Sequence, residues 1–350
     1  MRTSQLTITR FIAAVSIVVF HFGKGIYPFN SGLAAMLFNN ANVAVSYFFN
    51  LSGFVMIIAY GSAKKEVNTK DYYINRLAKI YPVYLLALLV MLFYAGKLAW
   101  AKLIGEVLLI HAAVPSFLPS YNLPDWSLSV EMFFYLVFPF LFNKFYLKNR
   151  LKVSAMAIVG FWLISQIASY LLSVNMGSIP PDYVSSVFYN PLVHFNEFFV
   201  GNLIGLMYLN LQTNKRVTGN YPFIFFLILM AAICLVVPHF KAFGLKLPVN
   251  FHNGFLSIVF APFILLLALN AGRISRLLSA PFLVYLGEIS YCIYILQFAV
   301  FQSWWAIFGK GGGTLYRFYL PLLLLLLISA LAYHLVELPG KRFIRARLKS

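Results

Sequence analysis

Residues Thr9–Gly23 read TRFIAAVSIVVFHFG, an apolar run with an arginine near its start and a histidine near its end. In an α-helix the step from Arg10 to His21 covers about three turns, roughly 16 Å, and places both side chains on nearly the same face. Ionisable groups are costly in contact with lipid, so a shared face indicates a path lined by protein within the membrane. Two other interpretations stay open, because Arg10 can anchor the helix at the membrane surface and His21 can be a hydrogen-bonded packing residue.

The composition indicates a membrane protein. Of the 350 residues, 61% are hydrophobic and 10% are charged, and the mean hydropathy is +0.82. A soluble domain cannot bury that much apolar surface. The net charge of +18 comes from basic residues in short loops between apolar runs, where they act as topology signals, so no nucleic-acid partner is expected. Cys234 and Cys292 both lie in apolar segments, and neither a disulfide nor a metal site is predicted.

Apolar runs long enough to span a bilayer predict an all-α membrane protein with about ten transmembrane helices. The expected spans are about 7–24, 41–60, 77–96, 127–143, 153–174, 191–210, 221–238, 253–271, 282–308 and 316–337. A further stretch near 98–114 is shorter, and Lys102, Glu106 and His111 interrupt it. If it does not cross, every strongly basic loop falls on one side, which the positive-inside rule assigns to the cytoplasm. We therefore expect a non-spanning or re-entrant segment at 98–114, both termini in the cytoplasm and a single membrane domain over 1–350.

Two further cations stand where the third span begins. Arg76 and Lys79, in YYINRLAKIYPVY, are three residues apart and share a helical face at the cytoplasmic end. Two cations there suit a phosphorylated ligand that enters from the cytoplasm. Ordinary positive-inside anchoring is the alternative, and it explains many such pairs.

Glu131 is an acid within the apolar segment NLPDWSLSVEMFFYLVFP (122–139), with Ser127 and Tyr135 one turn to either side. This span enters from outside, so Glu131 lies at a depth similar to that of His21, which is reached from the opposite side. A carboxylate beside a buried histidine selects the tautomer of the imidazole and stabilises its cation. We therefore predict that Glu131 orients His21. The alternative is a structural ion pair between Glu131 and a basic side chain.

Glu197, in HFNEFFVGNLIG, is a second acid within an apolar span. It has no obvious partner in the sequence, and we expect it to be structural. Neither this acid nor any other group in the pattern predicts a metal site.

Six segments between residues 10 and 342 carry a resemblance to a known family. They are Arg10 with His21 in the first span, YFFNLSGFVM (47–56), NRLAKIYPVY (75–84), DWSLSVEMFFYLVFP (125–139), GEISYCIYILQ (287–297) and VELPGKR (336–342). Together and in this order they resemble the acyltransferase-3 family of integral membrane acyltransferases. The resemblance implies a ten-helix core in a bacterial-type inner or plasma membrane. It also implies a cytoplasmic acyl-coenzyme A donor, usually acetyl-coenzyme A, and an acceptor hydroxyl on a cell-envelope carbohydrate or related molecule.

The resemblance also implies roles for single residues. The catalytic histidine of the family maps to His21, the arginine that precedes it maps to Arg10, and the glutamate of the SLSVE segment maps to Glu131. The sequence departs from the family pattern in two places, the basic motif of the third span and the end of the GEISYCIYILQ segment. Lys79, like Asn75, stands where arginine is often found, which bears on contacts with the coenzyme phosphates. Gln297 stands where a second histidine is often found, so that histidine is not required here.

The expected mechanism places the coenzyme phosphates near Arg10, Arg76 and Lys79 and the thioester near His21. His21 then acts as general base on the acceptor hydroxyl or, in a second version, as the nucleophile of an acyl-histidine intermediate. The competing hypothesis is a transporter or flippase for polysaccharide or acyl groups, which would be favoured by inverted repeats. The charge patterns of the two halves of the chain do not align.

Overall fold

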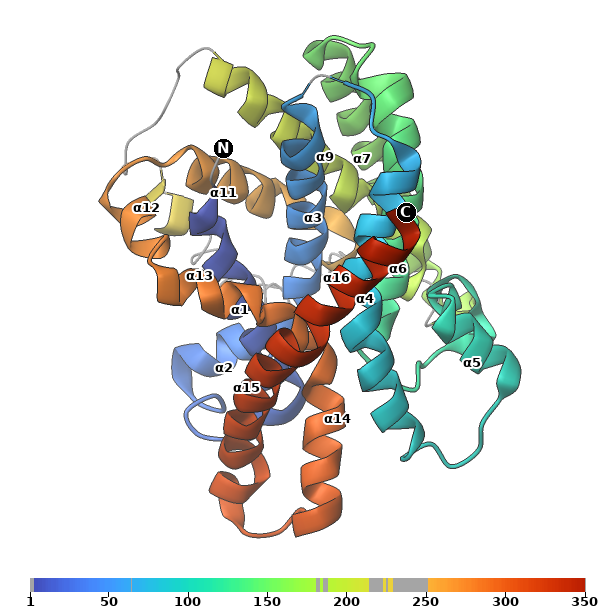
Figure 1. Cartoon of the computed structure of the whole chain (residues 1–350), viewed down its shortest axis with the longest axis vertical. Coiled ribbons are helices and arrows are strands. Elements are labelled where there is room, and N and C mark those ends of the chain that lie inside the picture. The colour runs from blue at the N-terminus through green and yellow to red at the C-terminus, as the bar shows by residue number, and fades with distance from the viewer. Residues whose placement is uncertain are drawn as a thin grey trace.

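The described chain is built from helices joined by turns, with no strand among residues 3–63, 65–180, 183–184, 188–213, 223–224, 226–228 and 251–349 of this computed structural model (Figure 1). The main helices are α1 (Thr7–Val18), α2 (Gly32–Phe38), α3 (Ala44–Gly61), α4 (Thr69–Leu92), α5 (Trp100–Val107), α6 (Asp125–Leu141), α7 (Leu151–Val174), α9 (Pro191–Thr213), α11 (Ser257–Leu269), α12 (Arg273–Leu278), α13 (Pro281–Glu288), α14 (Ser290–Phe308), α15 (Leu320–Ala332) and α16 (Leu338–Lys349). The predicted all-α class is confirmed.

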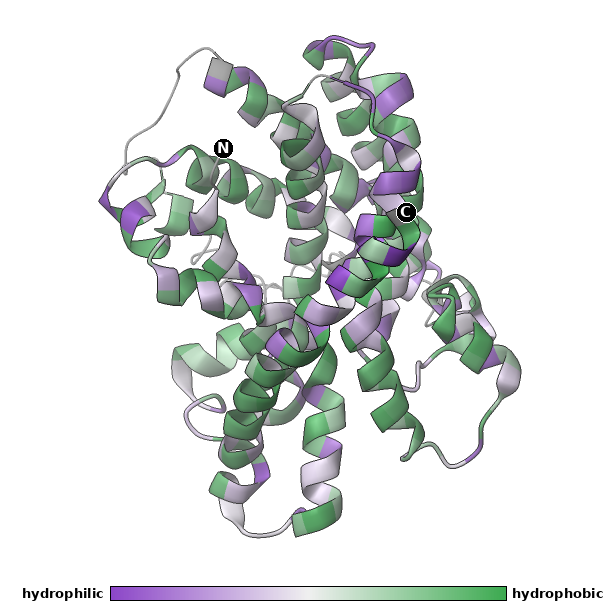
Figure 2. Ribbon diagram, in the orientation of Figure 1, coloured by the Kyte–Doolittle hydropathy of each residue, from purple (hydrophilic) through white to green (hydrophobic). Residues whose placement is uncertain are grey.

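Eight helical segments of the described residues are long and apolar enough to cross a membrane. They are Ser4–Gly23, Ala41–Gly61, Thr69–Leu92, Asp125–Tyr146, Leu151–Val174, Pro191–Gln212, Ser290–Phe308 and Leu315–Leu348. Figure 2 shows that hydrophobic residues dominate these helices. The polytopic membrane class is thus confirmed. The expected span 221–238 lies largely outside the described residues, and the expected span 253–271 contains the shorter apolar helix α11.

The segment expected not to cross contains α5, which has only eight residues, whereas a membrane helix needs about 20. Buried contacts tie this segment to its neighbours. Tyr84 of α4 donates a hydrogen bond to the Glu106 backbone carbonyl over 2.6 Å, and the Glu106 carboxylate accepts one from the Tyr121 N–H over 2.7 Å. Burial raises the pKa of Glu106 to about 7. The segment is therefore a packed excursion between α4 and α6, on the edge of the molecule in Figure 1.

Helices α3 and α9 lie side by side because glycines let their backbones touch (Figure 1). A Cβ atom on Gly53 would lie 2.1 Å from the Phe198 carbonyl oxygen, and one on Gly201 would lie 2.1 Å from that of Asn50. Small residues at such contacts are typical of membrane helices, where close packing replaces the hydrophobic effect. The contact fixes one side of α3, and Ser52, beside Gly53 in the chain, lines a pocket.

The first span is held in place by the GEISYCIYILQ segment. A Cβ atom on Gly287 would lie 2.0 Å from the Thr7 carbonyl oxygen, so α13 packs directly on the start of α1. The chain then turns at Ile289 into α14, and Ser290 Oγ donates to the Gly287 carbonyl over 2.6 Å. The expected continuous span 282–308 is therefore wrong, because this turn divides it into α13 and α14. The turn places the first residues of α14 beside α1.

The last helix, α16, runs across α4 and carries several of the hydrophilic residues visible in Figure 2. A Cβ atom on Gly340 would lie 2.7 Å from the Pro82 side chain, so the two helices approach closely at this crossing.

Candidate active site

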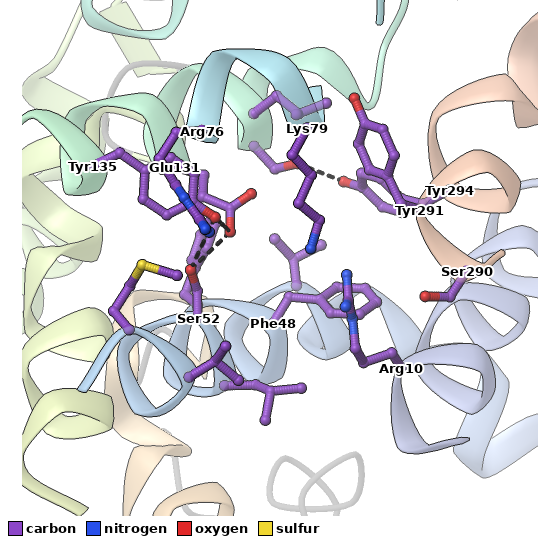
Figure 3. Close-up of a pocket in the computed structure, with 17 residues that line it drawn as sticks. Arg10, Phe48, Ser52, Arg76, Lys79, Glu131, Tyr135, Ser290, Tyr291 and Tyr294 are labelled. Atoms are coloured by element: carbon purple, nitrogen blue, oxygen red, sulfur yellow. Dashed lines mark hydrogen bonds between the residues drawn. The ribbon is translucent and has the colours of Figure 1, made fainter. Parts of the chain in front are cut away.

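One pocket gathers polar residues from five helices, α1, α3, α4, α6 and α14 (Figure 3). Four of the five site residues named from the sequence line it: Arg10, Arg76, Lys79 and Glu131. The other polar residues of its lining are Ser52, Ser127, Tyr135, Ser290, Tyr291 and Tyr294. We call this the cationic pocket. It brings together groups that are far apart in the sequence, because α3, α4 and α14 enclose the end of α1 that carries Arg10.

The three cations of this pocket form no ion pair with an acid among the described residues. Figure 3 shows the charged ends of Arg10 and Lys79 pointing toward each other, and two like charges in this arrangement repel. Arg76 lies over the Tyr135 ring, 5.5 Å from its centre, and its buried Nε has no hydrogen-bond partner. In the described part of the chain, no carboxylate oxygen lies within 4 Å, the limit for an ion pair, of the charged nitrogens of Arg10, Arg76 or Lys79. The pocket is therefore suited to an anion.

Glu131 is held by hydroxyl groups. One carboxylate oxygen accepts hydrogen bonds from Ser52 Oγ over 2.8 Å and from the Tyr135 hydroxyl over 2.5 Å (Figure 3). The Glu131 carboxylate also attracts the Arg76 guanidinium electrostatically, without an ion pair between them. No hydrogen bond or ion pair joins Glu131 to His21 among the described residues. The predicted direct pairing of these two is therefore not formed in this structure.

His21 lines a second cavity, of about 340 Å³, which we call the histidine cavity. Its lining is mainly apolar and aromatic: Ile17, Phe20, Asn42, Val45, Leu123, Pro124, Trp126, Phe188, Tyr189 and Tyr294. The His21 ring packs edge-on against Phe298, with 5.1 Å between ring centres. A volume of this size lies within the range of about 300–1,000 Å³ that is typical of small-molecule sites.

Arg10 and His21 lie about three helical turns apart along the first span, and the helical geometry changes between them. The first span does not stay α-helical to its end, because residues Val19–Gly23 form a π-turn that includes His21. In a π-turn each hydrogen bond spans one more residue, so each residue advances by a smaller angle than in an α-helix. The same-face relation expected for regular α geometry is therefore shifted at His21. Turns of this kind are frequent at functional sites.

Tyr294 forms the wall between the two cavities. Together with Val45 it lines both of them. Its hydroxyl lies 2.8 Å from Ser127 Oγ and 3.4 Å from the Pro124 carbonyl oxygen, within hydrogen-bond distance of both. Tyr294 belongs to the GEISYCIYILQ segment and was not predicted to have a role in the site. Its four-residue spacing from Ser290, which places both on one side of α14, was the available signal.

Glu197 has a partner after all. His194 Nδ1 lies 2.8 Å from its carboxylate, and His194 Nε2 lies 2.7 Å from the Phe188 carbonyl oxygen. The His194 ring also packs on Trp126, with 5.5 Å between ring centres. The pair has the i, i+3 spacing that helices favour, which could have revealed it in the sequence. It supports the aromatic wall of the histidine cavity, so the expected structural role is consistent with its contacts.

Glu337 is a further buried acid near the cationic pocket. It accepts a hydrogen bond from Cys292 Sγ over 3.4 Å and interacts electrostatically with Lys79, Arg10 and Lys341. Sequence reasoning did not assign it a role, although it stands in the VELPGKR segment. Within the described ranges, no three His, Cys, Asp or Glu side chains lie together as a metal site requires.

Comparison with known proteins gives a consistent picture. The model of a family described as "Acyltransferase domain" matches residues 4–335. The chain is 27% identical to the acyltransferase MdmB of Streptomyces mycarofaciens over 334 residues, which cover 86% of this chain and 80% of that protein. It is 28% identical to the exopolysaccharide production protein ExoZ of Rhizobium meliloti (strain 1021) over 317 residues, 87% of this chain and 90% of that one.

A third relative is longer. The Staphylococcus aureus (strain COL) protein SACOL0978, named provisionally as an O-acetyltransferase, is 21% identical over 362 residues, 95% of this chain but 56% of that protein. The chain thus spans little more than half of that relative. No solved structure matches the chain.

Proposed function

Because the chain belongs to the acyltransferase domain family and is an integral membrane acyltransferase, we propose that it moves an acyl group, usually acetyl, from cytoplasmic acyl-coenzyme A to a hydroxyl of a cell-envelope carbohydrate. Relatives named for O-acetyl transfer and for exopolysaccharide production support this choice of group and acceptor. Membership of an acyltransferase family removes the basis for the transporter alternative. The resemblance found in the sequence is thereby confirmed.

The observation that carries the donor assignment is the cationic pocket. Arg10, Arg76 and Lys79 line one small space, and no described carboxylate forms an ion pair with any of them. Three cations held together inside a membrane protein repel one another, and an anionic ligand relieves that repulsion. The phosphates of coenzyme A supply such anions, and the planar guanidinium groups suit phosphate oxygens.

The acceptor, on this proposal, occupies the histidine cavity. Trp126 and Tyr189 stand in its wall with 4.7 Å between ring centres, and they offer flat apolar faces of the kind that pack on sugar rings. His21 is the residue of the cavity lining whose side chain can accept a proton near neutral pH. An acceptor hydroxyl beside its imidazole then has a base within reach, while the thioester approaches from the cationic pocket through the wall at Tyr294.

The chemistry follows from this arrangement. A ring nitrogen of His21 takes the proton of the acceptor hydroxyl as its oxygen attacks the thioester carbonyl carbon. The carbon–sulfur bond breaks when the tetrahedral intermediate collapses, and the coenzyme leaves as a thiolate that regains a proton from the imidazolium. In the alternative version, His21 itself is acylated first, and this reaction takes place in the same cavity. Glu131 is assigned to the donor side, since its contacts are with Ser52, Tyr135 and the neighbourhood of Arg76.

The test uses the purified full chain in lipid nanodiscs with acetyl-coenzyme A. We expect slow thioester hydrolysis without acceptor, and we expect His21→Ala to abolish it while coenzyme A still binds. Lys79→Gln is expected to weaken coenzyme binding about tenfold or more, the cost of one charge-assisted hydrogen bond. Lys144→Gln, in the helical turn Phe142–Tyr146 that follows α6 and outside the pocket, is the matched control and should bind as the wild type does.

Two outcomes would contradict the proposal. If wild-type protein binds no coenzyme A, the donor assignment is wrong. If His21→Ala retains hydrolysis, the catalytic assignment is wrong. The acceptor is tested by mass analysis of envelope glycans from cells with and without the gene, where loss of acetyl groups is the expected result.

A further inference from the structure

The final helix, α16, has two faces that differ in exposure and charge. Residues 338–349 contain five basic side chains and no acidic one. Lys341, Ile344 and Arg345 lie on the partly buried face. Arg342, Phe343, Ala346 and Arg347 are exposed on the other side. Basic helices of this kind often rest on membrane surfaces, but that role places the cations in solvent, whereas two of these five turn toward the protein.

The partly buried face adjoins the cationic pocket. Glu337 precedes Lys341 by one helical turn, and its electrostatic partners are Lys79, Arg10 and Lys341. The crossing of Gly340 over Pro82 brings α16 onto α4, the helix that carries Lys79 (Figure 1). Lys341 therefore continues the row of positive charge outward from the pocket, next to the Arg10 end of the first span and away from the His21 end.

Arg345 extends this row by one more turn, because it follows Lys341 at the i, i+4 spacing. Its Nε is buried and has no hydrogen-bond partner. A buried donor without a partner is costly, and a guanidinium has five donors to satisfy. In the part of the chain that the structure describes, neither Lys341 nor Arg345 has a carboxylate within ion-pair distance. An anion with several acceptor oxygens would satisfy both.

We propose that Lys341 and Arg345 bind the phosphate monoester at the nucleotide end of the acyl donor. The inference rests on the proposed function, since it takes coenzyme A to be the donor. The thioester must face the histidine cavity, so the nucleotide end must face away from it. The basic face of α16 lies on that side. A phosphate monoester carries up to two negative charges and three acceptor oxygens, which matches an arginine and a lysine held one turn apart.

The experiment compares coenzyme A with 3′-dephospho-coenzyme A, which lacks only this phosphate. Calorimetry on the full chain in nanodiscs of phosphatidylcholine gives the Kd of each ligand. We expect wild type to prefer coenzyme A by about tenfold or more. Arg345→Gln and Lys341→Gln should each remove most of that preference and leave the Kd of 3′-dephospho-coenzyme A unchanged, which also reports correct folding. Arg342→Gln removes one charge from the exposed face and should keep the preference.

Three results would overturn the inference. The first is a loss of affinity in Arg345→Gln that is equal for coenzyme A and 3′-dephospho-coenzyme A. The second is a loss of the preference for coenzyme A in Arg342→Gln. The third uses nanodiscs that also contain phosphatidylglycerol: if Arg345→Gln changes only the retention of this anionic lipid and not the ligand preference, the cations serve lipid headgroups. Failure of wild type to bind either ligand is a different result, because it removes the proposed donor and this inference with it.

Discussion

Tyr294→Phe tests whether the wall between the two cavities limits the reaction. The substitution removes the hydroxyl that lies 2.8 Å from Ser127 Oγ and keeps the ring. Ser127 still donates to the Pro124 carbonyl over 3.0 Å, so no buried donor is left unpaired. A neutral hydrogen bond of this kind contributes about 0.5–1.5 kcal/mol. If the thioester reaches His21 only when this contact opens, its loss lowers the barrier by that amount and speeds hydrolysis roughly 2- to 13-fold.

The assay is release of free thiol from acetyl-coenzyme A without acceptor, at saturating donor. Tyr291→Phe is the matched control. The Tyr291 hydroxyl donates a hydrogen bond to the Ile80 carbonyl over 2.7 Å, and of the two cavities Tyr291 lines the cationic pocket and not the histidine cavity. The control should lose a similar amount of stability without faster hydrolysis. A Tyr294→Phe protein whose hydrolysis is unchanged or slower, or matched by the control, would refute the barrier role of this wall.

Three further predictions concern the role of Glu131, the titration of Glu106 and the orientation of the chain in the membrane. Glu131→Gln should keep turnover within about tenfold of wild type and tighten coenzyme binding, because Arg76 loses a nearby negative charge. A loss of turnover approaching the roughly 10⁴-fold seen when a catalytic histidine loses its carboxylate partner would instead support direct pairing of Glu131 with His21. Burial raises the pKa of Glu106 from its ordinary value of 4.5 to about 7. The folded state therefore holds this proton more tightly than the unfolded state, and the free energy of unfolding should fall by roughly 3 kcal/mol as pH rises from 4.5 to 7. The melting temperature of Glu106→Gln should depend less on pH over that range. In cells, Lys310→Cys should react with a membrane-impermeant thiol reagent and Lys148→Cys should not; the reverse labelling would overturn the predicted orientation.

The charged residues of the site could be found from the sequence because they interrupt apolar runs. A cation inside a membrane helix must face protein or a cavity, which pointed to Arg10. Arg76 and Lys79 were predicted because two cations on one face at the start of a span suit a phosphorylated ligand, and all three side chains line one pocket. The same reasoning gave most helices their approximate bounds, since a bilayer sets their length. The distribution of basic loops predicted that the segment 98–114 does not cross.

What the sequence could not supply was direction around the helix axis. His21 and Glu131 were matched by depth, but depth does not say which way a side chain points, and the π-turn at Val19–Gly23 leaves no trace in composition. The break between α13 and α14 depends on contact between Gly287 and Thr7, which are 280 residues apart, and only the folded chain reveals it. The place of Tyr294 between two cavities is likewise a property of the assembled helices.

The two cavities share only Val45 and Tyr294, and this arrangement has a consequence for engineering. On the proposed function, residues such as Phe20, Trp126 and Tyr189 can be varied in a library without touching the groups assigned to the coenzyme. Acceptor range can then be redesigned while donor recognition is kept constant. A helical scaffold with one cavity assigned to the donor and another to the acceptor is an economical starting point for acyltransferases that modify chosen acceptors.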